Sequence, residues 1–173
     1  RGSVTFCYVP VLLGGVFKAT GNQSPMQAYG HIAAKRDYDM LEIRRFIARH
    51  GITGFAMNPH FPVNTLLMMR GAVAAESLGC AEAYIEAMFA GMWEQGLKLD
   101  NPEVWAATVS AAGLDVAALG AAAADPEIKG RLVANTEAAV ARGVFGIPSF
   151  FLGDELWFGK DRLRDVVEAA EAG

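Results

Sequence analysis

The pattern of hydrophobic positions changes twice along the chain, and it begins with a strand-like run. Residues 4–13 (VTFCYVPVLL) are β-branched, aromatic or aliphatic and end at Gly14-Gly15, which is typical of a strand buried on both faces. Residues 16–27 are rich in Gly, Asn and Ser and favour a loop. The first part of the chain is therefore predicted to be a strand followed by a loop.

The middle of the chain shows the spacing of helices. Residues 37–49 carry Met40, Leu41 and Ile43 on one face, and Gly51 follows them, as expected for an amphipathic helix and its C-terminal glycine. Further helices are expected from Asn64 or Thr65 to about Leu78, over residues 80–95, from Asn101-Pro102, from Leu114-Asp115, and from Asp125-Pro126 to Arg142.

The last thirty residues return to a mixed pattern. Two short strands, residues 149–152 and 155–158, are predicted on either side of a Gly153-Asp154 turn, followed by a terminal helix over residues 162–172. The order strand, loop, helices, hairpin and helix indicates an α/β domain interrupted by helices. We expect residues 1–28 and 143–173 to form the α/β domain, with residues 29–142 as a helical insertion.

Composition narrows the functional classes. The 173 residues are 53% hydrophobic and 20% charged, which suits one globular domain with an insertion. The net charge of −4 and the scattered cations exclude a nucleic-acid footprint, and no apolar stretch is long enough to span a membrane. Cys7 and Cys80 form no C-x-x-C pair, so a reducing cytoplasm is expected. His31, His50 and His60 do not have metal-ligand spacing, and no metal site is predicted.

Three segments, in this order, resemble one family. They are residues 12–22 (LLGGVFKATGN), 58–65 (NPHFPVNT) and 144–163 (VFGIPSFFLGDELWFGKDRL). Together they resemble the 2-hydroxychromene-2-carboxylate isomerases, which are relatives of the kappa-class glutathione transferases in the DsbA-like thioredoxin group. The resemblance implies a thioredoxin-like α/β fold with a large all-helical insertion, glutathione as the cofactor, and a homodimer.

Two sites near the C-terminus carry most of the implied glutathione contacts. Pro148 precedes a strand, where proline marks an edge, a strand start or a cis bond. The resemblance implies a cis bond, with the backbone of Ile147 paired to the cysteinyl part of glutathione. Lys160, Asp161 and Arg162 start a helix, which is either a surface cap or an anion site. The resemblance implies that these residues hold the γ-glutamyl end, with the Asp161 side chain on its ammonium group.

The resemblance implies further contacts from the earlier segments. Asn22 is expected against the glutathione peptide and Lys35 near its carboxylate. Lys18 and Tyr38 are expected to bind the carboxylate and phenol of a small aromatic substrate. Asn64 is expected in the extended segment that follows the cysteine–glycine end of glutathione and meets the substrate. The residues alone leave simpler alternatives open. Lys18 can be a solvated surface lysine, Asn22 a turn residue, Tyr38 a structural side chain and Asn64 a helix cap.

The implied function is a glutathione-dependent isomerase. A glutathione thiolate would add to the unsaturated ring carbon of the substrate, the ring would open, a carbon–carbon bond would rotate, and elimination would return the thiol. A kappa-type transferase or peroxidase is the alternative. A thiol–disulfide oxidoreductase needs a cysteine pair that these residues do not offer, and a non-catalytic glutathione-binding protein also stays open.

The strand expected at residues 4–13 has no predicted neighbour. A parallel neighbour needs a crossover of about a dozen or more residues, so we expect roughly thirty residues of the natural protein upstream of Arg1. The resemblance implies that this segment holds the serine that stabilises the glutathione thiolate. Ser3, Ser24 and Ser149 lie before a strand, in a loop and after Pro148, and none is expected to replace it.

Overall fold

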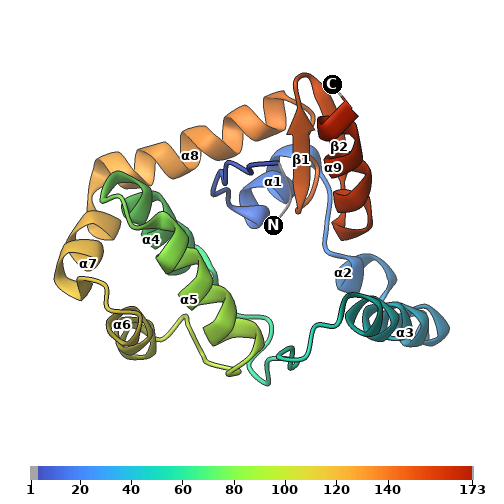
Figure 1. The fold of residues 1–173 in the computed structure, drawn as a ribbon, viewed down its shortest axis with the longest axis horizontal. Coiled ribbons are helices and arrows are strands. Elements are labelled where there is room, and N and C mark those ends of the chain that lie inside the picture. The colour runs from blue at the N-terminus through green and yellow to red at the C-terminus, as the bar shows by residue number, and fades with distance from the viewer. Residues whose placement is uncertain (1–3, 173) are drawn as a thin grey trace. The chain divides into compact units, whose positions relative to one another are not determined.

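The elements of the chain form two compact units in the computed structural model, which describes residues 4–172 (Figure 1). The terminal unit contains the residues up to Asn22 and those from Leu132 onward. The helical unit is Gln23–Arg131. The division falls inside α8 (Pro126–Ala141), which contributes its first turns to one unit and the remainder to the other.

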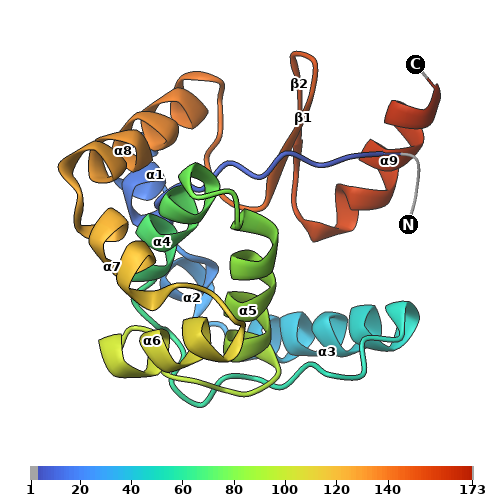
Figure 2. The same cartoon turned by 60° about the vertical axis from the view of Figure 1, so that its left-hand side comes forward.

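The terminal unit holds the two strands found in the described residues. Its elements are α1 (Leu13–Thr20), the second part of α8, β1 (Ser149–Leu152), β2 (Glu155–Phe158), the 3-10 helix η1 (Lys160–Arg162) and α9 (Leu163–Ala172). The strands pair antiparallel, with Ser149 opposite Phe158 and Leu152 opposite Glu155. This confirms the predicted hairpin. Figure 2 shows the chain passing from the hairpin directly into α9, whose Val166 is buried.

The strand predicted at residues 4–13 is wrong. Residues 4–12 form neither helix nor strand and pair with no strand among the described residues. The segment is held by α8 instead, because Asn135 Nδ2 donates to the Pro10 carbonyl at 3.2 Å and Leu12 N donates to Thr136 Oγ1 at 3.0 Å. A β-branched and aromatic composition favours a strand only where a neighbouring backbone completes the ladder.

The loop predicted at residues 16–27 is also wrong, because α1 and α2 (Pro25–Tyr29) occupy most of it. Gly15 lies inside α1, where a Cβ would stand 3.0 Å from the Thr136 Cγ2 atom of α8. The glycine therefore allows two helices to approach closely and does not end a strand. Ser24 forms a capping box with Gln27 and starts α2.

The helical unit confirms the helices expected from the spacing. It contains α2, α3 (Ala33–His50), α4 (Leu66–Ser77), α5 (Ala81–Trp93), α6 (Pro102–Ala111), α7 (Val116–Ala124) and the first turns of α8. Asn101 Oδ1 accepts from Glu103 N at 2.8 Å, and Asp115 Oδ1 accepts from Ala118 N at 2.9 Å. These bonds satisfy backbone donors that have no partner inside their helices. No helix in the described part of the chain is long and apolar enough to cross a membrane.

Tyr84 is the centre of the core of the helical unit. Its hydroxyl donates to the Met68 carbonyl at 3.1 Å and accepts from Trp105 Nε1 at 2.8 Å, which joins α4, α5 and α6. A Cβ at Gly71 of α4 would lie 2.0 Å from the Tyr84 hydroxyl oxygen, so only glycine allows this ring to lie against α4. Burial raises the pKa of Tyr84 to about 12, with the Trp105 hydrogen bond acting in the opposite direction.

We expect Tyr84→Phe to lower the free energy of unfolding by about 1–3 kcal/mol, because the buried Trp105 indole N–H loses its acceptor. Urea denaturation measures the change. Tyr38→Phe removes the same hydroxyl from an exposed ring and should stay within about 0.5 kcal/mol of the wild type. Equal effects of the two substitutions would show that the buried hydroxyl does not stabilise the unit.

Tyr84 also sets an alkaline limit on stability. Its ordinary pKa is 10.0 and its pKa in the folded chain is about 12, so the folded state holds this proton more tightly than the unfolded state. The stabilisation is complete below pH 10 and is lost as the pH rises through 12. We expect the melting temperature to fall between these pH values, and to fall less in Tyr84→Phe than in Tyr38→Phe.

Candidate functional site

The loop before β1 contains the predicted cis proline. The Ile147–Pro148 bond is cis, which confirms the prediction, and Phe61–Pro62 is a second cis bond that was not predicted. Asn22 Nδ2 donates to the Phe145 carbonyl at 2.8 Å. Ser149 Oγ donates to the Gly146 carbonyl at 2.7 Å. The loop is therefore fixed at both of its ends by side chains of the terminal unit.

Ile147 offers its backbone for pairing. None of the described residues hydrogen-bonds to its N–H or C=O group, and the residue is 44% exposed. It precedes Pro148 in the bend that leads into β1. An extended peptide can add to such a position through main-chain hydrogen bonds.

A group of opposite charges stands next to this loop. Gly159 N donates to the Pro148 carbonyl at 2.9 Å, so η1 starts beside the cis bond. Lys160 Nζ lies 2.6 Å from Asp161 Oδ1, and Arg162 Nη1 lies 2.8 Å from Asp165 Oδ2. The side chains are exposed, and the positive end of the helix dipole lies at the same place. Both signs of charge are thus available for a zwitterionic group.

A pocket of about 540 Å³ borders this loop. Its lining is mostly apolar and comes from residues 4–11, α8, β1 and α9, with Ile147 and Ser149 at the loop. None of residues 14–22 is part of the lining. The Arg142 guanidinium lies 3.6 Å over the Phe151 ring and donates to the Gly153 carbonyl at 2.8 Å. Cys7 also faces the pocket as a free thiol.

Six of the predicted site residues lie together around this loop of the terminal unit. The six, all in the terminal unit around the loop, are Asn22, Ile147, Pro148, Lys160, Asp161 and Arg162. Lys18 is exposed near the end of α1. The remaining three, Lys35, Tyr38 and Asn64, belong to the helical unit.

Those three residues already have local roles or are exposed. Lys35 Nζ lies 3.1 Å from Asp39 Oδ2 and 5.1 Å from the centre of the Tyr29 ring. Tyr38 is 56% exposed. Asn64 Oδ1 accepts from Leu66 N at 3.0 Å, but the N-cap of α4 is Thr65, so Asn64 is not itself the helix cap.

Sequence reasoning missed Gly159, Gly146 and the aromatic contact beside them. The Phe145 and Phe158 rings lie 4.6 Å apart, and a Cβ at Gly146 would stand 2.9 Å from the Phe158 ring. The two phenylalanines flank the cis-proline loop and the end of β2, so this contact helps to hold the loop against the hairpin. The sequence signal for this contact was that each of the two phenylalanines directly precedes a glycine, at residues 145–146 and 158–159.

Comparisons with known proteins agree over nearly the whole chain. The family model of the DSBA-like thioredoxin domain matches residues 1–171. The 2-hydroxychromene-2-carboxylate isomerase of Pseudomonas putida is 30% identical over 162 residues, which are 92% of this chain and 76% of that protein. The one from Pseudomonas sp. strain C18 is 31% identical over 158 residues, 90% of this chain and 71% of that protein.

A solved structure from the same group of isomerases is also similar to this chain. The chain matches a structure of selenomethionine 2-hydroxychromene-2-carboxylate isomerase with a TM-score of 0.79 and 28% identity. The match covers 94% of this chain and 77% of the solved one. Likeness therefore extends across both compact units.

We expect Gly159→Ala to lower the free energy of unfolding by about 1–3 kcal/mol, because φ 95° and ψ 151° at this position suit only glycine. Urea denaturation measures the change. Gly14→Ala is the matched control, since Gly14 is helical and a Cβ there meets nothing within 4 Å. The control should be neutral or stabilising by up to about 1 kcal/mol. Identical unfolding of the two variants would contradict the assigned backbone geometry.

Proposed function

The chain belongs to the DSBA-like thioredoxin family and, within it, to the 2-hydroxychromene-2-carboxylate isomerases, and from this we propose that it catalyses that isomerisation or one on a closely related small aromatic substrate. The observation that carries the proposal is the 30% identity over 92% of the chain. The thioredoxin-like fold with a helical insertion, expected from the sequence, is the fold of this family.

We further propose that glutathione binds at the cis-proline loop. When bound, glutathione supplies a thiol nucleophile for reversible addition to the substrate. Two observations support the fit. The unpaired backbone of Ile147 suits an extended tripeptide, and the charges of Lys160 and Asp161 suit a group that carries both an ammonium and a carboxylate.

The roles of the chain's own residues follow from this placement. Backbone N–H groups at the start of η1 would hold the α-carboxylate, and the Asp161 carboxylate would accept from the ammonium group. Asn22 would act by holding the Phe145 carbonyl and hence the loop. Lys18, Tyr38, Asn64 and Lys35 stay predictions for the substrate and the far end of glutathione. The cytoplasmic location and the homodimer are also proposals.

An assay of the natural protein with 2-hydroxychromene-2-carboxylate, with and without glutathione, tests the proposal. We expect isomerisation that depends on glutathione. Turnover at the same rate without glutathione would contradict the proposed role of glutathione, and the proposed isomerase activity would stand. Conjugation of an electrophilic aromatic compound without any isomerisation would instead favour a kappa-type transferase.

We expect glutathione to raise the melting temperature by mass action on the folded state, and Asp161→Ala to abolish most of this rise. The unliganded melting temperature should change little, because an exposed aspartate in the first helical turn contributes about 0.3–1 kcal/mol. Asp154→Ala, in the exposed hairpin turn, is the matched control and should keep the full response. An unchanged response in Asp161→Ala would count against this site.

A further inference from the structure

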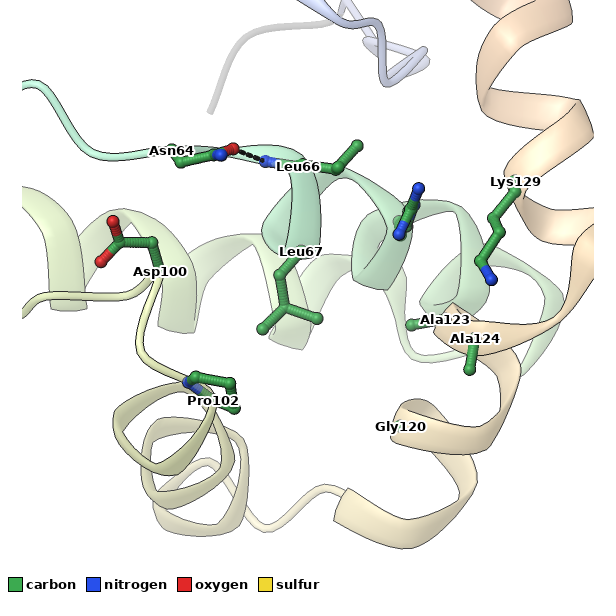
Figure 3. Close-up of a pocket in the computed structure, with 10 residues that line it drawn as sticks. Asn64, Leu66, Leu67, Asp100, Pro102, Gly120, Ala123, Ala124 and Lys129 are labelled. Carbon is green, nitrogen blue, oxygen red and sulfur yellow. Dashed lines mark hydrogen bonds between the residues drawn. The ribbon is translucent and has the colours of Figure 1, made fainter.

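The helical unit contains a pocket of its own, and among the residues that line it only Asn64 is also predicted for the isomerase site. Its volume is about 440 Å³, which is large enough for a small organic molecule. It lies among α4, the start of α6, α7 and the first turns of α8 (Figure 3). The lining residues are Asn64, Leu66, Leu67, Arg70, Asp100, Pro102, Gly120, Ala123, Ala124 and Lys129.

Two cations of this pocket have no acidic partner. Arg70 of α4 and Lys129 of α8 are both half-buried, and neither forms an ion pair or hydrogen bond with a side chain in the part of the chain that the structure describes. By contrast, the neighbouring Arg131 pairs with Glu76 at 2.9 Å. Half-burial of an unpaired cation costs free energy, and two cations that line the same pocket attract an anion. Figure 3 shows Lys129 extending along the pocket toward Ala123 and Ala124.

The polar groups at the opposite end of the pocket already have hydrogen-bond partners. Lys98 Nζ lies 2.6 Å from Asp100 Oδ1, and this hydrogen bond, together with one from the Asn64 backbone, holds the pKa of Asp100 below its usual value. Asn64 Oδ1 accepts from Leu66 N. Figure 3 shows Asn64 and Asp100 at the end away from Lys129. Asp100 is therefore paired with Lys98 and forms no ion pair with Arg70 or Lys129 among the described residues.

The surface between the two ends is apolar and open. Leu67, Pro102 and Ala123 provide it, and Gly120 in α7 adds no side chain. A Cβ at Gly120 would meet nothing within 4 Å. Glycine inside a helix costs about 1 kcal/mol relative to alanine, and here it leaves the pocket unfilled. A ligand that reaches the cations can place a ring or alkyl group on this surface.

We propose that this pocket binds small organic carboxylates. The Arg70 guanidinium takes the carboxylate in a two-point contact, for which its planar shape is suited, and Lys129 adds a second charge. The apolar body of the ligand lies against Leu67 and Ala123. The proposal does not depend on the isomerase activity.

Binding of benzoate to the natural protein, measured by calorimetry without glutathione, tests the site. We expect saturable binding that weakens as salt rises. Benzamide, the neutral analogue, should bind at least about tenfold more weakly, because the charge-assisted hydrogen bonds are lost. Inorganic phosphate should also bind more weakly than benzoate, because it cannot use the apolar surface. No saturable benzoate binding, or equal binding of benzoate with either benzamide or phosphate, would overturn the proposal.

Substitution of the two pocket cations tests whether benzoate binds in this pocket. Arg70→Met and Lys129→Met should each weaken benzoate binding about tenfold. Arg44→Met removes the same charge from an exposed position on α3 and should leave the affinity within about twofold of the wild type. Affinities in Arg70→Met and Lys129→Met that match Arg44→Met would sink the proposal.

Gly120→Leu gives a second test that keeps both cations. The leucine has space and improves the helix propensity of α7, so the melting temperature should be retained while benzoate binding is lost. Methyl NMR shifts at Leu67 and Ala123 should accompany binding in the wild type. Benzoate binding that survives in Gly120→Leu, or shifts confined to Lys160–Arg162, would place the ligand elsewhere and overturn the proposal.

Discussion

The hydrogen bond from the Gly159 N–H to the Pro148 carbonyl, 2.9 Å long, is the contact on which the candidate site depends. It joins two segments that would otherwise be connected only through the hairpin. One segment presents the unpaired backbone of Ile147, and the other presents the charges of Lys160 and Asp161. Because Gly159 has φ 95°, the chain can end β2, make this bond and start η1 within one residue.

The core of the helical unit depends on buried polar side chains whose hydrogen bonds are all made inside the unit. Tyr84 is a large side chain buried against the backbone of α4, and the missing side chain of Gly71 provides the space. Its hydroxyl accepts a hydrogen bond from the Trp105 N–H and donates one to the Met68 carbonyl. Asn58, also buried, donates to the carbonyls of Met92 and Leu97 at 2.9 Å. In each case a buried polar group has its partners, which is the condition for burying it without a large cost.

The two pockets differ in chemistry because their linings differ. The pocket beside the cis-proline loop is mostly apolar. Arg142, the one charged group of its lining among residues 4–172, is stacked on Phe151 and donates to the Gly153 carbonyl. The pocket of the helical unit holds two unpaired cations over a small apolar surface. An extended peptide suits the first region and a compact organic anion suits the second. Glutathione binding in the first region is proposed from the family resemblance, whereas the proposal for the second region follows from charge and space alone.

The sequence by itself determined the helices with clear caps, such as Asn101 and Asp115, and both strands of the hairpin, because these depend on bonds between residues close in the chain. It also indicated the cis bond at Pro148, through the family resemblance. Only the tertiary structure decided that residues 4–12 form no strand and that Gly15 lies inside α1. Both depend on α8, more than a hundred residues away, since a strand needs a neighbouring backbone and a helical glycine is explained by what packs against it.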